Sequence, residues 1–379
     1  MLETLISQLG EAAAAAIGGL AIGALFGFVA QKSRFCLRAA TIDFWRGALT
    51  QKVTIWLLAF GAAVVATQIA ILTDMLDTSG IRYLNARASI SGALIGGAMF
   101  GCGMVLTRGC ASRLLVLSAN GNLRALLSGL VFAVVAQASF RGMLSPAREF
   151  LAEMWTISAP GALNVLAWTG AGVEGGLVFG LVWLTAGLSM AWRQELSISV
   201  ILSALAVGLL VTAGWMFTSQ MTMVSFDPQP VRSLSFSGPS ANLLMMILAT
   251  PGGRLDFDAG LVPGVVLGSF LSALLARELK LEGFHDGWAM RRYITGAVLM
   301  GFGSMLAGGC AIGAGVSGAA VFATTAWLTL LAMWLAAGLT DRLIDAPRDV
   351  AGHVTPRGGA TNGMASVEPA MPRSGAFRP

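Results

Sequence analysis

The sequence predicts an all-α integral membrane protein with about nine transmembrane helices and further short, broken helices, on two observations. Hydrophobic residues make up 56% of the 379 residues and charged residues only 11%, whereas a soluble domain carries about 25% charged residues. The chain also contains a series of apolar stretches whose lengths are close to the roughly 20 residues that a helix needs to cross a bilayer. These features exclude an ordinary soluble enzyme, and the surrounding lipid bilayer is the first expected partner.

The expected spans follow one another along the chain as runs of predominantly apolar residues. They lie at 12–30, 53–73, 90–107, 123–140, 175–191, 198–217, 260–276, 294–307 and 320–340. Two shorter apolar stretches, 162–170 and 242–250, fall below spanning length and predict interfacial or re-entrant segments. After a membrane domain at 1–344, residues 345–379 are rich in Pro, Gly, Arg and Ser without periodicity, which predicts a disordered cytoplasmic tail.

Basic residues predict the orientation, because loops rich in Lys and Arg stay in the cytoplasm. The densest basic cluster follows the first span and contains Lys32, Arg34, Arg38, Arg46 and Lys52. This loop is therefore expected in the cytoplasm and the N-terminus outside. An odd number of spans places the C-terminus in the cytoplasm. The basic residues form no stripe with interleaved aromatic residues, so no nucleic acid is expected as a partner.

The chain contains an internal repeat at an offset of 200 residues. The segment GGAMFGCGMVLTRGCA at 96–111 aligns with GAVLMGFGSMLAGGCA at 296–311, and both contain GxGxxLxxGCA. The predicted topology makes the first copy run inward and the second outward, so the two copies are expected to be inverted, in halves of roughly 12–170 and 175–344. In transporters built this way, the substrate site lies near the bilayer midplane between broken helices.

Each copy has the composition of a broken helix, in which a short apolar run is followed by Gly-Cys and a second short apolar run. The glycines expected to support the breaks are Gly101, Gly109, Gly301 and Gly309, because glycine accepts positive φ and allows the backbone to approach a ligand. Helix N-termini at such breaks carry positive partial charge. The sequence therefore predicts an anion site at the breaks.

Four cysteines are candidates for this site, namely Cys36, Cys102, Cys110 and Cys310. Cys110 and Cys310 occupy equivalent positions and are expected to face each other across a pseudo-two-fold axis. Their thiols are polarizable, weak hydrogen-bond donors, which favours a soft sulfur ligand. Cys36 lies among basic residues that would attract an anion. Cys102 has no counterpart in the second copy and is interpreted as a small buried hydrophobic residue.

Other chemistries find little support in the residue types. The sequence has only two histidines and no CxxC pair, so no metal site is expected, and no other cofactor is indicated. A nucleotide-binding GxxxxGK[ST] motif is absent, which excludes direct use of ATP. Intramembrane carboxylates, which commonly mark proton relays, are scarce. Facilitated flow and proton coupling both stay open.

Four segments resemble the YeeE/YedE family, the TsuA-type thiosulfate permeases. They are QKSRFC at 31–36, GCGMVLTRGCASR at 101–113, GWMFTSQMT at 214–222 and GFGSMLAGGCAIG at 301–313, and the similarity extends over most of residues 12–343. The resemblance implies a non-enzymatic permease of a bacterial inner membrane that imports thiosulfate, with Cys36, Cys110 and Cys310 as a cysteine relay. It also implies a separate TusA-like sulfur-carrier protein as a cytoplasmic partner.

Two alternatives remain open at this point. The first is transport of another sulfur or selenium compound, since the site chemistry would be nearly identical. The second is a membrane sulfurtransferase in which Cys36 forms a persulfide, which requires a reactive thiol with access to donor and acceptor.

Overall fold

The computed structural model describes residues 10–225, 230–249, 255–283 and 287–345. The chain divides into two units, residues 1–345 and 346–379. Apart from Asp345, the predicted tail therefore lies outside the described residues. The fold below is that of the first unit, which contains every predicted span and every candidate cysteine.

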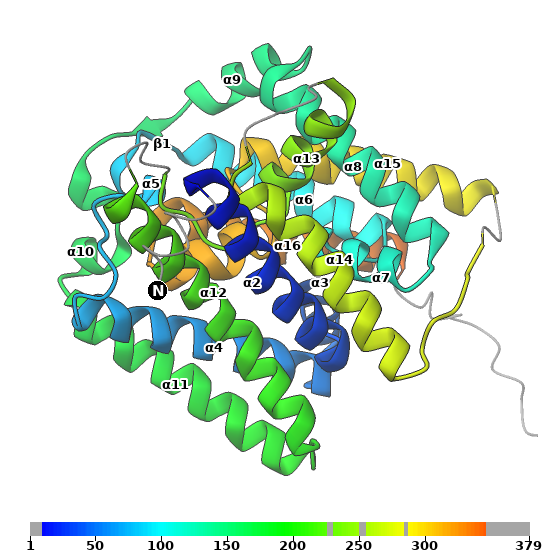
Figure 1. Cartoon of the computed structure of the whole chain (residues 1–379), viewed down its shortest axis with the longest axis horizontal. Helices are drawn as coiled ribbons and strands as arrows, with labels where there is room; N and C mark the ends of the chain where they lie inside the picture. The colour runs from blue at the N-terminus through cyan, green and yellow to red at the C-terminus, as the bar shows by residue number, and fades with distance from the viewer. Residues whose placement is uncertain (1–9, 226–229, 250–254, 284–286, 346–379) are drawn as a thin grey trace, which may run out of the picture. The chain divides into compact units, whose positions relative to one another are not determined.

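The first unit is built from helices (Figure 1). The long ones are α2 (Glu11–Ser33), α4 (Gln51–Leu72), α6 (Ile90–Leu106), α8 (Leu123–Arg141), α11 (Gly172–Arg193), α12 (Ile198–Val224), α14 (Phe257–Leu275), α15 (Gly287–Leu306) and α16 (Thr324–Ile344). The short ones are α3 (Leu37–Trp45), α5 (Arg82–Asn85), α7 (Ala111–Ala119), α9 (Ser145–Glu153), η1 (Pro160–Ala162), α10 (Val165–Thr169), α13 (Ser237–Ala249) and the π-helix η2 (Gly313–Gly318). The strands β1 (Ala88–Ser89) and β2 (Thr156–Ile157) form an antiparallel pair.

Each predicted span falls on one of the long helices. Among the described residues, eight helical segments are long and apolar enough to cross a membrane, which agrees with an all-α integral membrane protein. The ninth prediction falls on α15, which has 20 residues but contains Arg291 and Arg292 in its second turn, and these charges lower its hydropathy. The two shorter apolar stretches fall on α10 and α13, neither of which reaches spanning length.

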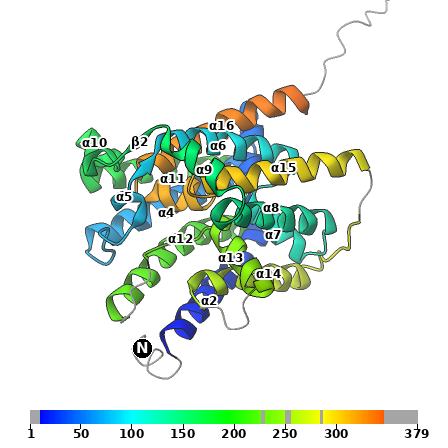
Figure 2. The ribbon, with the colours of Figure 1, turned by 90° about the horizontal axis from the view of Figure 1, so that it is seen from above.

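The packing of the long helices has an internal symmetry. Helix α2 contacts α12 and α14, α12 contacts α4, α6 contacts α15 and α16, and α8 contacts α15. Figure 2 shows α2, α12 and α14 on one side and α6, α15 and α16 on another. Exchanging α2 with α12, α4 with α14, α6 with α15 and α8 with α16 leaves these contacts unchanged. Two related halves would produce this pattern, and the halves with their limits stay a prediction.

Glycines let α6 and α15 approach closely at the centre of this arrangement. A Cβ atom on Gly96 would lie 2.6 Å from the carbonyl oxygen of Gly303, and one on Gly103 would lie 2.5 Å from that of Gly296. The earlier glycine of each helix thus meets the later glycine of the other, so the two helices are antiparallel. The two copies of the repeat run in opposite directions, as expected for an inverted pair.

Gly101 and Gly301 lie elsewhere than the sequence predicted. They are inside α6 and α15 and not at the breaks, which follow Leu106 and Leu306. A Cβ on Gly101 would lie 2.5 Å from the carbonyl oxygen of Met333 in α16, and one on Gly301 would lie 2.8 Å from that of Phe132 in α8. These glycines serve helix packing, which in lipid depends on small residues at the contacts.

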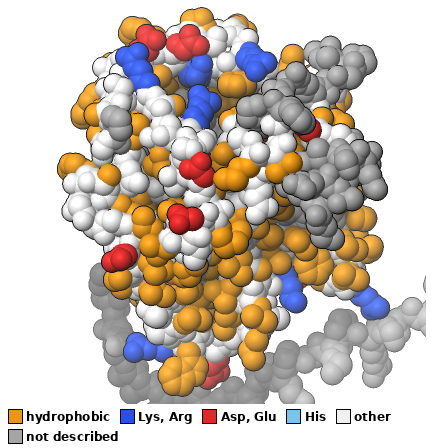
Figure 3. Space-filling model, turned by 60° about the vertical axis from the view of Figure 1, so that its left-hand side comes forward, with side chains coloured by type: hydrophobic (Ala, Val, Ile, Leu, Met, Phe, Trp, Pro, Cys, Tyr) orange, Lys and Arg blue, Asp and Glu red, His pale blue; other side chains and the backbone are white. Residues whose placement is uncertain are grey.

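Many large apolar side chains face outward from these helices. Exposed leucines and valines include Val178, Val182, Leu202, Leu209 and Leu271 on α11, α12 and α14. Figure 3 shows one broad hydrophobic area, with charged side chains gathered above it and at its lower rim. A soluble protein rarely exposes apolar area on this scale, so this surface fits contact with lipid tails.

The glycine contact between α6 and α15 leads to a stability prediction. Gly96→Ala is expected to destabilise the protein by about 1–3 kcal/mol, because the added methyl group would press on backbone atoms that cannot rotate away. Gly129→Ala in α8 is the matched control, since a Cβ there meets nothing within 4 Å. Thermal unfolding in detergent measures both variants. Equal melting temperatures would show that α6 and α15 are not tightly packed at Gly96.

Candidate functional site

The two repeated cysteines, Cys110 and Cys310, lie at breaks between helices. Helix α6 ends at Leu106 and α7 begins at Ala111, with Cys110 as its N-cap residue. In the second copy, α15 ends at Leu306 and Cys310 precedes η2. Each break contains a left-handed residue, Arg108 at φ 56° and Gly308 at φ 79°. The positive φ thus falls one residue before Gly109 and Gly309, which lie within the breaks as predicted.

Gly309 is required by a close contact. A Cβ on Gly309 would lie 2.8 Å from the backbone nitrogen of Ala314 and 2.9 Å from the Tyr83 hydroxyl oxygen. That hydroxyl donates a hydrogen bond of 2.9 Å to the carbonyl oxygen of Gly308. Helix α5 is thereby attached to the second break.

Cys310 is fully buried and surrounded by weak donors. The backbone N–H of Phe236 donates to its sulfur at 3.3 Å, and that of Gly313 donates at 3.4 Å. The Ser235 hydroxyl lies 3.9 Å from the same sulfur. The Phe236 ring packs on Phe26 of α2 at 5.3 Å between ring centroids, which holds this backbone segment in place. The sulfur of Cys310 therefore accepts two N–H groups, which leaves its own S–H proton available to donate.

Cys110 and Cys36 form a pair of thiols. Cys110 is fully buried, and its sulfur is close enough to Cys36 for a hydrogen bond between the two thiols. The Ser112 hydroxyl lies 3.4 Å from the Cys110 sulfur. Cys36 is the N-cap residue of α3 as Cys110 is of α7, and neither side chain caps its helix. Both thiols thus lie at the positive ends of helices.

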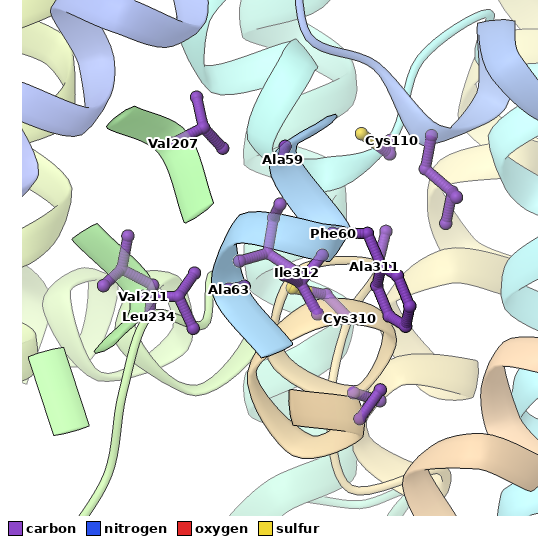
Figure 4. Close-up of a cluster of buried hydrophobic side chains, with 14 of the residues drawn as sticks. Ala59, Phe60, Ala63, Cys110, Val207, Val211, Leu234, Cys310, Ala311 and Ile312 are labelled. Carbon is purple, nitrogen blue, oxygen red and sulfur yellow. The ribbon is translucent and has the colours of Figure 1, made fainter. Parts of the chain in front are cut away.

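The structure therefore brings the three predicted cysteines into two groups. Figure 4 shows the sulfur atoms of Cys110 and Cys310 within one cluster of buried side chains that includes Phe60 and Ile312. Cys102 lies apart, half-buried on α6, where its sulfur accepts a hydrogen bond of 3.1 Å from the Thr340 hydroxyl. The sequence predicted a small buried hydrophobic residue, whereas this side chain is only half-buried and makes a polar contact.

Sequence reasoning missed Ser235 and Phe236. At the offset of 200 residues, Phe236 aligns with Cys36, and the backbone N–H of Phe236 contacts Cys310 as the Cys36 thiol contacts Cys110. The aligned segments SRFCL at 33–37 and SLSFS at 233–237 share only their first serine. A backbone donor leaves no sequence signal, so only the repeat offset could have indicated this equivalence.

A cavity of about 340 Å³ lies at the other end of the segment that reaches Cys310. Its lining includes Phe217, Thr218, Arg232 and Asp256. Arg232 forms an ion pair with the buried carboxylate of Asp258 in the first turn of α14. The Thr218 hydroxyl accepts a hydrogen bond of 3.1 Å from the backbone nitrogen of Arg232. These contacts anchor residues 231–236 and so position Ser235 beside Cys310.

The site suits a soft anion better than a hard cation. Its contacts to sulfur come from thiols, hydroxyls and backbone N–H groups, and the helix ends contribute positive partial charge. Among the described residues there is no group of three or more His, Cys, Asp or Glu side chains that could hold a metal ion.

Comparison with known proteins supports this interpretation. The model of a family described as Sulphur transport matches residues 32–339. The chain belongs to this family. Its relatives include the thiosulfate transporter TsuA of Escherichia coli (strain K12), 26% identical over 84% of this chain and 92% of that protein. The thiosulfate transporter TsuA of Spirochaeta thermophila is 27% identical over 86% of this chain and 98% of that protein.

The family assignment agrees with the resemblance inferred from the cysteine motifs. This member of the Sulphur transport family is a multi-pass membrane protein that acts in transport and not as an enzyme. The matched region contains Cys36, Cys110 and Cys310 together with both helix breaks.

Proposed function

We propose that the protein is a thiosulfate permease of the bacterial inner membrane that imports the anion past Cys36, Cys110 and Cys310. The observation that carries this proposal is the burial of Cys110 and Cys310 at the ends of broken helices, with the half-buried Cys36 beside Cys110 and weak donors around the sulfur of Cys310. Both relatives are named thiosulfate transporters, which supports the same substrate.

The chemistry of thiosulfate fits the two groups of sulfur contacts. Its terminal sulfur is a soft acceptor for thiol donors, and its oxygens accept hydrogen bonds from N–H and hydroxyl groups. Cys310 offers one binding position and the Cys36 and Cys110 pair offers another. Transport requires binding that is strong enough for the anion to enter. The binding must also be weak, or shared among several positions, so that the anion can leave. A relay between two weak positions meets this requirement without a deep trap.

The proposed orientation follows the basic residues. Lys32 and Arg34 at the end of α2 support a cytoplasmic position for that end of the helix, with the N-terminus outside and residue 345 inside. The anion would then meet Cys310 first and the Cys36 and Cys110 pair second. Net import would follow from consumption of thiosulfate inside the cell. Binding of a TusA-like carrier on the cytoplasmic side stays a prediction.

Uptake of radiolabelled thiosulfate tests the proposal in a bacterium that lacks its own sulfate and thiosulfate importers. Cells that express the protein are expected to accumulate label faster than cells with an empty vector. Excess unlabelled thiosulfate should suppress uptake, and excess sulfate should suppress it much less, because sulfate lacks the terminal sulfur. Membrane expression without uptake, or equal suppression by sulfate, would show that the substrate assignment is wrong. Selenium compounds in the same competition assay test the alternative substrates.

A sulfurtransferase function at Cys36 receives less support. Its half-buried thiol is hydrogen-bonded to Cys110, whereas persulfide transfer needs a free thiol with access for a donor and an acceptor. Persulfide labelling after exposure to thiosulfate tests this alternative directly. A stable label on Cys36 would favour the transferase.

A further inference from the structure

Arg38 and Arg113 lie near the Cys36 thiol of the Cys36 and Cys110 pair, and Arg108 lies near Arg38. Arg38 lies in α3, Arg108 lies in the turn between α6 and α7, and Arg113 lies in α7. Arg38 and Arg113 are close enough to the Cys36 thiol to interact with it electrostatically, and Arg38 interacts in the same way with Arg108. Two separate segments of the first half thus place positive charge next to the thiol pair.

Other arginines in this region are neutralised by carboxylates. Arg46 forms two hydrogen bonds of 2.8 Å to Asp341, and Arg34 pairs with Glu278 at 3.1 Å. Arg292 donates to both carboxylate oxygens of Asp345. These bonds lower the pKa of Asp345 below its ordinary value, so its carboxylate is ionised and already engaged. The nearby acidic groups are therefore committed to other partners.

Arg38 and Arg108 interact with the carboxylate of Asp345 only at longer range than these pairs, and Arg38 does so with Asp341 as well. Within the part of the chain that the structure describes, neither forms an ion pair, and the Nε atom of Arg38 is buried without a hydrogen-bond acceptor. Arg113 makes one long contact of 3.5 Å to the side-chain oxygen of Gln31. An unpaired buried donor and two neighbouring like charges both destabilise the protein. A bound anion would relieve both effects.

Comparing the two copies of the repeat shows that the positive charge of Arg108 and Arg113 is present only in the first half. At the offset of 200 residues, Arg108 and Arg113 align with Gly308 and Gly313. Gly308 adopts φ 79° and Arg108 adopts φ 56°, a conformation that glycine accepts at no steric cost. The first half therefore carries a strained arginine where the same turn is built with glycine in the second half.

We propose that Arg38, Arg108 and Arg113 form an oxyanion-binding station on the cytoplasmic side of the Cys36 and Cys110 pair. Its ligand is a tetrahedral divalent oxyanion, and in transport this is the sulfonate end of thiosulfate while the terminal sulfur remains on the thiols. This step rests on the proposed function. Guanidinium groups suit the site because their planar N–H pairs match two oxygens at once. The station would draw the anion from the neutral passage to the cytoplasmic mouth.

Binding of thiosulfate and sulfate to the purified protein in detergent tests the station by isothermal titration. R108G and R38Q are expected to weaken thiosulfate binding at least about tenfold, the effect of removing a hydrogen bond between charged groups. R34G is the matched control for R108G. Arg34 has φ 53° and is exposed to solvent like Arg108, but it is paired with Glu278. R34G should bind thiosulfate within about twofold of the wild type, since its charge is already neutralised.

Comparing sulfate with thiosulfate distinguishes a failure of the oxyanion-binding station from a failure of the proposed transport function. Sulfate lacks the terminal sulfur, so it should bind more weakly than thiosulfate, lose affinity in R108G and be unaffected by Cys110→Ala. Arg-dependent sulfate binding in a protein that moves no thiosulfate would support the station and reject the transport assignment. Thiosulfate binding in R108G and R38Q equal to the wild type would overturn the station, even if uptake is intact. R108G decides the outcome if R38Q does not fold, because glycine already forms the equivalent turn at Gly308.

Discussion

Cys110→Ala is expected to lower thiosulfate uptake roughly tenfold or more, because removing one partner of a buried hydrogen bond costs about 1–3 kcal/mol. The Cys110 sulfur contacts both Cys36 and the Ser112 hydroxyl, so its loss removes the central contact of the relay. Cys36→Ala and Cys310→Ala should reduce uptake to a similar extent. Initial rates of radiolabelled uptake, normalised to the amount of protein in the membrane, provide the measurement.

Cys102→Ala is the control for this series. Cys102 also lies in α6, but its sulfur contacts Thr340 and none of the other thiols, so uptake should stay close to the wild type. A loss of uptake in Cys102→Ala as large as in Cys110→Ala would mean that the losses reflect folding and not a relay. Full activity of all three relay variants would exclude the cysteine relay and leave the route of the anion to other groups.

Asp258→Ala is expected to have the largest effect on stability, about 3–5 kcal/mol, because it leaves the charge of Arg232 partly buried without its closest partner. Asp258 is 4% exposed and bonded to Arg232. The carboxylate of Asp256, 3.9 Å from Arg232, compensates in part, so the loss should fall toward the lower end of this range. Uptake should fall as well, because Arg232 anchors the segment that brings Ser235 and Phe236 to Cys310.

Thermal unfolding and uptake measured on the same membranes check this prediction. Glu149→Ala removes the partner of Arg148 in an ion pair whose acidic side chain is 60% exposed, and exposed pairs contribute only about 0–1 kcal/mol. It should therefore unfold close to the wild type. If Asp258→Ala behaves like Glu149→Ala, the ion pair does not hold residues 231–236 in place.

Local patterns predicted the helices well. Each long helix appears where an apolar stretch was expected, since a bilayer requires such a stretch for every span. The shared GxGxxLxxGCA motif predicted both breaks and both buried thiols, because glycine and cysteine recur there at the same spacing. The same motif misled for Gly101 and Gly301, since a glycine that permits a break and one that permits close packing look identical in a sequence.

The contacts of Cys310 could not be predicted from local sequence patterns. Its contacts come from the backbone of Phe236 and Gly313, and a backbone N–H is present in every residue except proline. No residue type marks which of these groups will face a thiol. The sequence likewise revealed how many arginines the protein has but not which of them pair with carboxylates.

The sequence by itself determined that this protein is helical, crosses a membrane, carries an inverted glycine-cysteine repeat and belongs with sulfur transporters, because these properties depend on residue types and their spacing along the chain. Only the tertiary structure decided that Cys36 meets Cys110, that a backbone segment meets Cys310, and that the Nε atom of Arg38 is buried without an acceptor among the described residues. The physical reason is that these contacts join segments far apart in the chain, and their geometry arises from helix packing that no local pattern encodes.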